Sequence, residues 1–272
     1  MKFKGLQIFY TVHCIIQCIG GIHVSKFKSL LLFTQNMLFE QLNEGVWAMT
    51  YIIVDEKTRE AAIVDPVYDY LENYVQRLES DGLTLKYAIA SHMHADHITA
   101  CFTLREQLGC DYVMWKSTSS LGVNRYVEDE EKLMLGSIPI QFHHCPGHTS
   151  DSVIVHVPGY MMTGDFLFNG EGGVGRDDLP GGRMHVHWDS LSVLERFSEE
   201  TIVCSGHESP GTEMKTLGWN MLNNPILLMD DFESFKSWQI ASAEKLGSVS
   251  KIKVAVPANL FAEIPEHIPW MD

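Results

Sequence analysis

Ser91-His92-Met93-His94-Ala95-Asp96-His97 is the stretch that decides the fold, because it places four potential metal ligands within six residues. Imidazole nitrogens and carboxylate oxygens are preferred ligands of zinc and iron. One face of a strand or helix cannot present four such side chains at this spacing. We therefore expect this HxHxDH motif on a loop between a strand and a helix, with His92 and His94 directed at one point and Asp96 and His97 at a second.

Three later positions repeat a single pattern. His148, Asp165 and His207 each follow a strand-like apolar run and stand directly after a glycine. Layered α/β folds assemble their sites at strand ends, and glycine lets the backbone approach a site closely. We therefore predict a metal site built from seven side chains: His92, His94, Asp96, His97, His148, Asp165 and His207. Within it, Asp96 and His97 are also the candidate catalytic residues.

The hydrophobic pattern between these ligands alternates strands with helices. We predict strands at 46–54, 60–64, 85–90, 138–143, 152–157, 160–163 and 201–205. We predict helices at 71–78, 96–107, 188–197 and 231–246. Because the chain has no low-complexity linker and no internal repeat, the pattern indicates one α/β domain in which helices cover the outer faces of two sheets.

The composition is that of a globular protein with an acidic surface. The 272 residues are 45% hydrophobic and carry a formal net charge of −15. Such a surface repels phosphate backbones and anionic lipids, so we expect neither nucleic acid nor a membrane as a partner. The six cysteines form no CxxC pair, which argues against a structural zinc clip and indicates reduced thiols.

The first 36 residues differ from the rest of the chain. Residues 1–39 hold four lysines and no acidic residue. Polar residues interrupt the apolar run 5–24, which makes it a poor membrane span. We interpret residues 1–36 as an extension, either outside the fold or with a targeting role, and residues 37–272 as the catalytic domain. We expect a cytoplasmic protein, with a mitochondrial or exported location left open by this extension.

The series of motifs resembles the metallo-β-lactamase superfamily, with all seven ligand positions filled over roughly residues 37–260. The resemblance implies a four-layer αββα sandwich that carries its metal at one edge. Within the superfamily, Gly175-Arg176-Asp177-Asp178, the Asn224-Pro225 pair and the segment 254–260 (VAVPANL, which ends in AVPANL) are similar to persulfide dioxygenases. The sequence departs from that family at Cys145, Val174 and Glu208-Ser209, around the expected pocket.

The dioxygenase resemblance implies one Fe(II) per chain, held by His92, His148 and Asp165. The implied reaction consumes glutathione persulfide, O2 and water and yields sulfite and glutathione. Two histidines and one carboxylate leave open positions on the metal for a sulfur and for O2. Arg176 is the candidate substrate-binding residue: it either pairs with a carboxylate of glutathione or braces the loop beside the metal.

Two alternatives stay open. A dinuclear zinc hydrolase of the glyoxalase II type, a hydroxyacylglutathione thioesterase, would use two Zn(II). One zinc would bind His92, His94 and His148, the other would bind Asp96, His97 and His207, and Asp165 would bridge them. Glu208 favours this alternative. A metal-binding protein without catalysis is the second. In each enzymatic case the partner is a small-molecule thiol compound, and a homodimer stays open.

Histidines outside the ligand set have simpler interpretations. His185 and His187 form a second HxH pattern, but no later ligand accompanies it, so we predict that they face solvent or cap a helix. His143 and His144 are adjacent on a predicted strand, where side chains alternate. One of these two should therefore be buried and the other should point outward.

Overall fold

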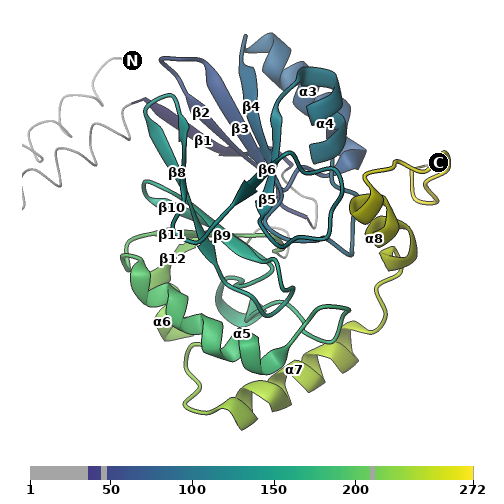
Figure 1. The fold of residues 1–272 in the computed structure, drawn as a ribbon. Helices are drawn as coiled ribbons and strands as arrows, with labels where there is room; N and C mark the ends of the chain where they lie inside the picture. The colour runs from purple at the N-terminus through teal and green to yellow at the C-terminus, as the bar shows by residue number, and fades with distance from the viewer. Residues whose placement is uncertain (1–35, 44–47, 209–211, 272) are drawn as a thin grey trace, which may run out of the picture.

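The computed structural model describes residues 36–43, 48–208 and 212–271, which form two six-stranded sheets packed face to face (Figure 1). The first sheet contains, in spatial order, β1 (Met37–Gln41), β2 (Tyr51–Asp55), β3 (Glu60–Val64), β4 (Thr84–Ile89), β5 (Asp111–Trp115) and β6 (Arg125–Val127). The strands from β1 to β3 pair antiparallel, and those from β3 to β6 pair parallel.

The second sheet has the order β12-β11-β10-β9-β8-β7. Its strands are β7 (Lys132–Leu135), β8 (Ile138–His144), β9 (Val153–Val157), β10 (Tyr160–Gly164), β11 (Ile202–Ser205) and β12 (Lys215–Thr216). Only β10 and β11 pair parallel within it, and the other neighbours are antiparallel.

Helices cover both outer faces. The first sheet is covered by α3 (Leu71–Ser80) and α4 (Cys101–Leu108), and η1 (Tyr68–Tyr70) precedes α3 (Figure 1). The second sheet is covered by α5 (Met184–Ser190), η3 (Leu191–Arg196), α6 (Leu217–Asn223) and α7 (Phe232–Leu246). Two further elements are η2 (Gly170–Gly172) and α8 (Ile252–Phe261), and α8 packs against Ile98 in the loop before α4.

Three clusters of buried apolar side chains fill the spaces between these layers. One lies between the sheets and includes Ile53 and Phe142, both fully buried. The second joins α3 and α4 to the first sheet, and the third joins α5, α6 and α7 to the second sheet. The αββα sandwich implied by the sequence resemblance is therefore confirmed.

Hydrogen bonds between the sheets bring the ligand-bearing ends of both to one edge. The Val153 amide donates to the Ser91 carbonyl at 2.9 Å, and the Met49 amide donates to the Gly206 carbonyl at 2.8 Å. The buried Tyr51 hydroxyl also donates to the Ser205 carbonyl at 2.8 Å. The loop after β4 therefore meets the start of β9, and the start of β2 meets the end of β11.

Several predicted boundaries were wrong. The helix predicted at 96–107 begins only at Cys101, because residues 96–100 form a loop that turns Asp96 and His97 toward the site. The helix predicted at 188–197 begins four residues earlier and continues as the 3₁₀ helix η3. The strand predicted from residue 46 begins at Tyr51, and residues 44–47 lie outside the described residues.

Other expectations have mixed outcomes. His143 is buried and His144 is partly exposed, as the alternation of a strand requires. Residues 1–35 lie outside the described residues, so the interpretation of the N-terminal extension stays a prediction. Across the described segments, no helix combines the length and apolar character that crossing a membrane needs.

Candidate metal centre

The sheet edge brings the seven predicted ligands together as two groups of three, the first and the second trio, with His207 beside both. His92, His148 and Asp165 form the first, in which the potential ligand atoms all lie within 4.8 Å of one another. His94, Asp96 and His97 form the second under the same limit. His207 joins them, since its Nε2 lies 3.4 Å from Asp96 Oδ2 and 3.5 Å from Asp165 Oδ1.

The first trio is held in the correct tautomer for metal binding. Ser91 Oγ donates to Asp65 Oδ2 at 2.8 Å, so it accepts the proton of His92 Nδ1 at 2.9 Å. His148 Nδ1 donates to the Arg176 carbonyl at 2.6 Å. In both rings the lone pair therefore sits on Nε2, which faces Asp165 Oδ2 at 3.9 Å from His92 and 3.5 Å from His148.

His94 of the second trio is oriented by Asp65, a residue that the sequence analysis did not single out. Asp65 Oδ1 lies 3.1 Å from His94 Nε2 and also accepts from the Ser91 amide at 2.7 Å. Its backbone is left-handed, with φ of 53°, a conformation that aspartate tolerates better than most residues. The signal was present in the sequence, because Asp65 directly follows an apolar strand as Asp165 does.

Four unpartnered atoms test whether these residues fit a metal ion. His92 Nε2, His94 Nδ1, His97 Nε2 and Asp165 Oδ1 are buried and have no hydrogen-bond partner in the described part of the chain. Leaving a buried polar atom unpaired costs about 1–3 kcal/mol, and four such atoms rarely gather by accident. All four can offer a lone pair, so the residues fit a cation.

The charges around the trios also suit a cation. Burial lowers the pKa of His92 well below its ordinary value, which keeps that imidazole neutral and able to bind a metal. Burial opposes charge on Asp65, but its contact with His94 holds the pKa of that carboxyl below its usual range. The Asp65 carboxylate can therefore accept the Nε2 proton of His94 at 3.1 Å, which leaves Nδ1 of a neutral His94 to offer its lone pair to a cation.

α8 fixes the HxHxDH loop through one side chain. The Asn259 amide donates to the carbonyls of His94 at 3.0 Å and His97 at 2.9 Å, and its oxygen accepts from the Thr99 amide at 2.9 Å. Asn259 is buried and belongs to the AVPANL segment. Sequence reasoning singled this segment out by resemblance, and the structure gives its asparagine a physical task.

A broad cleft of about 910 Å³ opens beside the ligands and is lined by Asp96, His148, Asp165 and His207. Arg176 also lines it, but its guanidinium is bound in place: Nε and one terminal nitrogen pair with both Asp178 oxygens at 2.6 Å. Its other terminal nitrogen donates to the Gly247 carbonyl at 2.7 Å. Arg176 thus braces the loop, and its binding of a substrate carboxylate stays a prediction.

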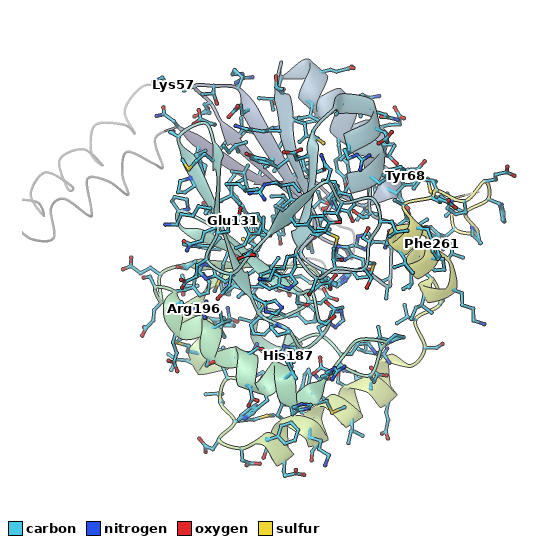
Figure 2. All side chains as sticks on the ribbon, in the orientation of Figure 1. Lys57, Tyr68, Glu131, His187, Arg196 and Phe261 are labelled. Carbon is cyan, nitrogen blue, oxygen red and sulfur yellow. The ribbon has the colours of Figure 1, made fainter. Side chains whose placement is uncertain are left out.

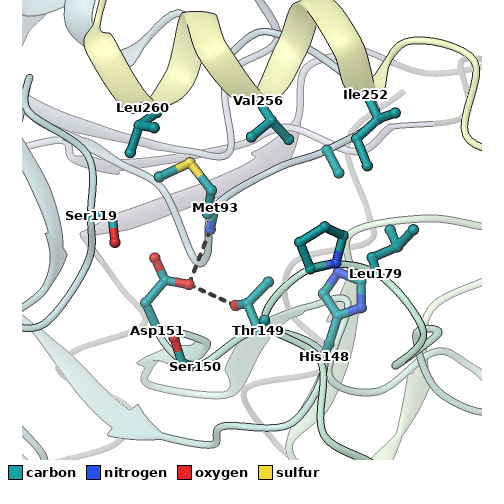
Figure 3. A pocket seen from close by; sticks show the side chains of 13 residues that line it. Met93, Ser119, His148, Thr149, Ser150, Asp151, Leu179, Ile252, Val256 and Leu260 are labelled. Carbon is teal, nitrogen blue, oxygen red and sulfur yellow. Dashed lines mark hydrogen bonds between the residues drawn. The ribbon is translucent and has the colours of Figure 1, made fainter.

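A smaller cavity of about 210 Å³ lies on the other side of His148 (Figure 3). Its wall on α8 is apolar, with Ile252, Val256 and Leu260 one turn apart. Asp151 lies on the opposite side, where it accepts from the Met93 amide at 3.3 Å and from Thr149 at 2.7 Å. Asp151 thereby ties the HxHxDH loop to the His148 turn.

Glu208, which favoured the hydrolase alternative, has a structural role here. Its Oε1 accepts from the Asn169 backbone amide at 2.9 Å, from the Asn169 side chain at 2.8 Å and from Ser205 Oγ at 2.5 Å. These contacts attach the residue after His207 to the loop after Asp165. Ser209 lies outside the described residues.

The family model described as the metallo-beta-lactamase superfamily matches residues 48–207, the span that contains every candidate ligand. The chain belongs to this superfamily. The site at the sheet edge is thus a metallo-beta-lactamase superfamily centre in both its fold and its donor set, and its His/Asp groups point to a bound metal.

Relatives within the superfamily include persulfide dioxygenases and hydroxyacylglutathione hydrolases. The chain is 30% identical over 229 residues to the mitochondrial persulfide dioxygenase ETHE1 of Homo sapiens, covering 82% of this chain and 88% of that one. The crystal structure of ETHE1 from Myxococcus xanthus superposes with a TM-score of 0.77 at 32% identity, over 83% of this chain and 99% of that one. The hydroxyacylglutathione hydrolase GloC of Haemophilus influenzae is 30% identical, over 64% of this chain and 89% of GloC.

Proposed function

We propose that the protein is a persulfide dioxygenase that oxidises glutathione persulfide to sulfite at one Fe(II) held by His92, His148 and Asp165. The observation that carries this proposal is the first trio, in which two imidazole Nε2 atoms face one carboxylate at 3.5 and 3.9 Å. Two histidines and one carboxylate with open positions are the donor set of non-haem iron oxygenases. The similarity to two ETHE1 proteins supports the same reaction.

The bound iron would supply electron transfer and two open positions, one for the persulfide sulfur and one for O2. The chain's own residues bind and orient. His92 and His148 keep their lone pairs toward the trio through Ser91 and the Arg176 carbonyl. The cleft receives the thiol substrate, and Lys245, which lines it, suits a carboxylate of glutathione, whereas Lys215 is paired with Glu213 at 2.7 Å.

The test is metal analysis of anaerobically purified protein combined with O2 uptake on added glutathione persulfide. We expect about one iron per chain and one O2 consumed for each sulfite formed. Two zinc ions per chain without any O2 uptake would contradict the proposal. Hydrolysis of S-lactoylglutathione by that zinc form would then support the second candidate.

A dinuclear zinc hydrolase is the second candidate because the second trio is also complete. His94, Asp96 and His97 gather their ligand atoms within 4.8 Å, and His97 Nε2 is buried without a partner. His207 Nε2 links the two trios, because it lies close to both Asp165 of the first trio and Asp96 of the second. The geometry groups His94 with Asp96 and His97, whereas the hydrolase assignment from the sequence places it with His92 and His148.

A further inference from the structure

His187 is fully buried, and the prediction that it faces solvent was wrong, whereas its neighbour His185 is exposed. His187 Nδ1 lies 2.8 Å from Asp177 Oδ1, and Nε2 lies 2.9 Å from the Phe166 carbonyl. The ring is therefore held between the Asp177 carboxylate on one side and the Phe166 carbonyl on the other. His187 sits where α5 and α7 cover the second sheet (Figure 2).

The carboxylate end of this pair is equally enclosed. The Asp177 side chain is fully buried, and its Oδ2 accepts from Gln239 on α7 at 3.0 Å. The same Gln239 amide donates to the Gly175 carbonyl at 2.9 Å, and its oxygen accepts from the Asp177 amide at 3.2 Å. Every hydrogen-bonding group of the pair is therefore satisfied inside the protein.

The His187–Asp177 pair lies one residue away in the chain from groups that hold the first trio in place. Phe166, which accepts from His187, follows Asp165 in the chain. Asp177 follows Arg176, whose carbonyl receives the His148 Nδ1 proton. Gly147 precedes His148 and packs on the His187 side chain so closely that an added Cβ would lie 2.3 Å from the His187 Cβ. The His187 side chain thus contacts the residue before His148 and the residue after Asp165.

The His187–Asp177 pair joins these loops through buried polar groups, each of which needs a hydrogen-bond partner inside the protein. Apolar side chains of the same shape are often as stable. The presence of such a pair beside a metal centre therefore indicates a role in orientation, because hydrogen-bonded partners of this kind fix ring rotation and ligand spacing.

We propose that His187 and Asp177 are positioning residues that set the distance and orientation of His148 and Asp165 for metal binding. The inference rests on the metal centre of the proposed function, and it holds for iron, zinc or cobalt alike. Neither residue touches substrate or metal, so both act through the Arg176 carbonyl, the Phe166 backbone and the Gly147 contact.

The test compares Co(II) binding to the metal-free protein for the wild type, His187→Gln and Asp177→Asn. We expect both variants to bind Co(II) about 10–100-fold more weakly and to shift the visible ligand-field spectrum. His185→Gln is the matched control, because it changes an exposed histidine on the same helix and should leave both readouts unchanged.

Unchanged Co(II) affinity and spectrum in folded His187→Gln and Asp177→Asn would overturn the proposal and leave the proposed function standing. Wild-type Co(II) binding without dioxygenase activity would remove the proposed function but not this inference. If these variants fail to fold, Gln239→Leu is the second test, because it removes the hydrogen bonds that hold Asp177 Oδ2 and the Gly175 carbonyl. We expect it to weaken Co(II) binding and shift the spectrum in the same direction, and an unchanged affinity and spectrum would overturn the proposal.

Discussion

His92 and His97 stand five residues apart on one loop, yet they have different surroundings. His92 Nε2 faces the carboxylate of Asp165 in the first trio, whereas His97 contacts Asp96 Oδ2 through Nδ1 at 3.1 Å. We expect His92→Ala to lose bound iron and more than about 100-fold in activity, because a facial triad cannot lose one of three ligands. His97→Ala should keep about one iron per chain and lose about 10–100-fold in activity.

Metal content by elemental analysis, with O2 uptake on the same samples, checks both variants. His185→Ala provides the control, since this exposed histidine contacts neither trio. A His97→Ala protein that loses half of two bound metals would instead favour the dinuclear centre. Full iron retention by His92→Ala would remove His92 from the ligand set.

A second residue-scale prediction concerns histidines away from the centre. Burial lowers the pKa of His156 to about 4, and burial also lowers the pKa of the adjacent His143. Both rings pack edge-on against Phe197, and neither nitrogen of His143 has a hydrogen-bond partner in the described structure. Protonation therefore favours the unfolded chain, where histidine has an ordinary pKa of about 6.5.

Acid therefore destabilises the folded protein at these histidines. Above about pH 6.5 the His156 ring is neutral in both the folded and the unfolded chain, so its contribution to stability is constant. That contribution becomes unfavourable as pH decreases from about 6.5 toward 4. By about pH 5, His156 alone removes about 2 kcal/mol of unfolding free energy. Urea unfolding of the metal-free protein near pH 8 and pH 5 should show His156→Leu to be less acid-sensitive by that amount. An equal pH dependence in wild type and variant would contradict this assignment.

At the scale of elements, α8 acts on the centre through Asn259. Asn259→Ala leaves three backbone groups of the HxHxDH loop unpaired, at His94, His97 and Thr99. Each unsatisfied buried group costs about 1–3 kcal/mol, so for three groups we expect a loss of at least about 3 kcal/mol in unfolding free energy. Metal affinity should also fall, because the loop that carries the ligands loses its support.

Chemical unfolding and metal competition on the same protein measure these two effects. Asn259→Asp should be at least as damaging, since a carboxylate would face two carbonyl oxygens. Lys253→Ala, an exposed change on the same helix, serves as the control. If Asn259→Ala matches Lys253→Ala in both measurements, α8 does not support the loop.

Sequence reasoning placed the ligands on loops correctly because strand, small residue and ligand recur in series. It misplaced the start of α4, since the apolar periodicity that marks a helix continues through residues 96–100, where tertiary bonds from Asn259 hold the chain in a loop. His187 was misassigned for a related reason. Its partners Asp177 and Phe166 lie 10 and 21 residues away, and only the packed fold brings them together.

At the scale of the whole molecule, the centre joins segments that are distant in the chain. Its candidate ligands come from the loop after β4 in the first sheet and from the ends of β8, β10 and β11 in the second. Hydrogen bonds such as Val153 to Ser91 and Met93 to Asp151 join the two sheets at this edge, and ligands from both sheets would meet at the metal. A metal bound to both sheets would therefore cross-link the two halves of the sandwich.

We accordingly expect metal removal to destabilise the entire fold rather than one loop. An ion present at about 1,000 times its dissociation constant adds about 4 kcal/mol of stability, provided it binds only the folded state. For a domain of this size, each kcal/mol shifts the melting temperature by about 2–4 °C, so chelation should lower it by about 8–16 °C. Asp165→Asn should melt near the chelated wild type and should not respond to chelator. A chelator-induced shift of equal size in Asp165→Asn would place the stabilising ion elsewhere, because only an ion bound at this sheet edge depends on that carboxylate.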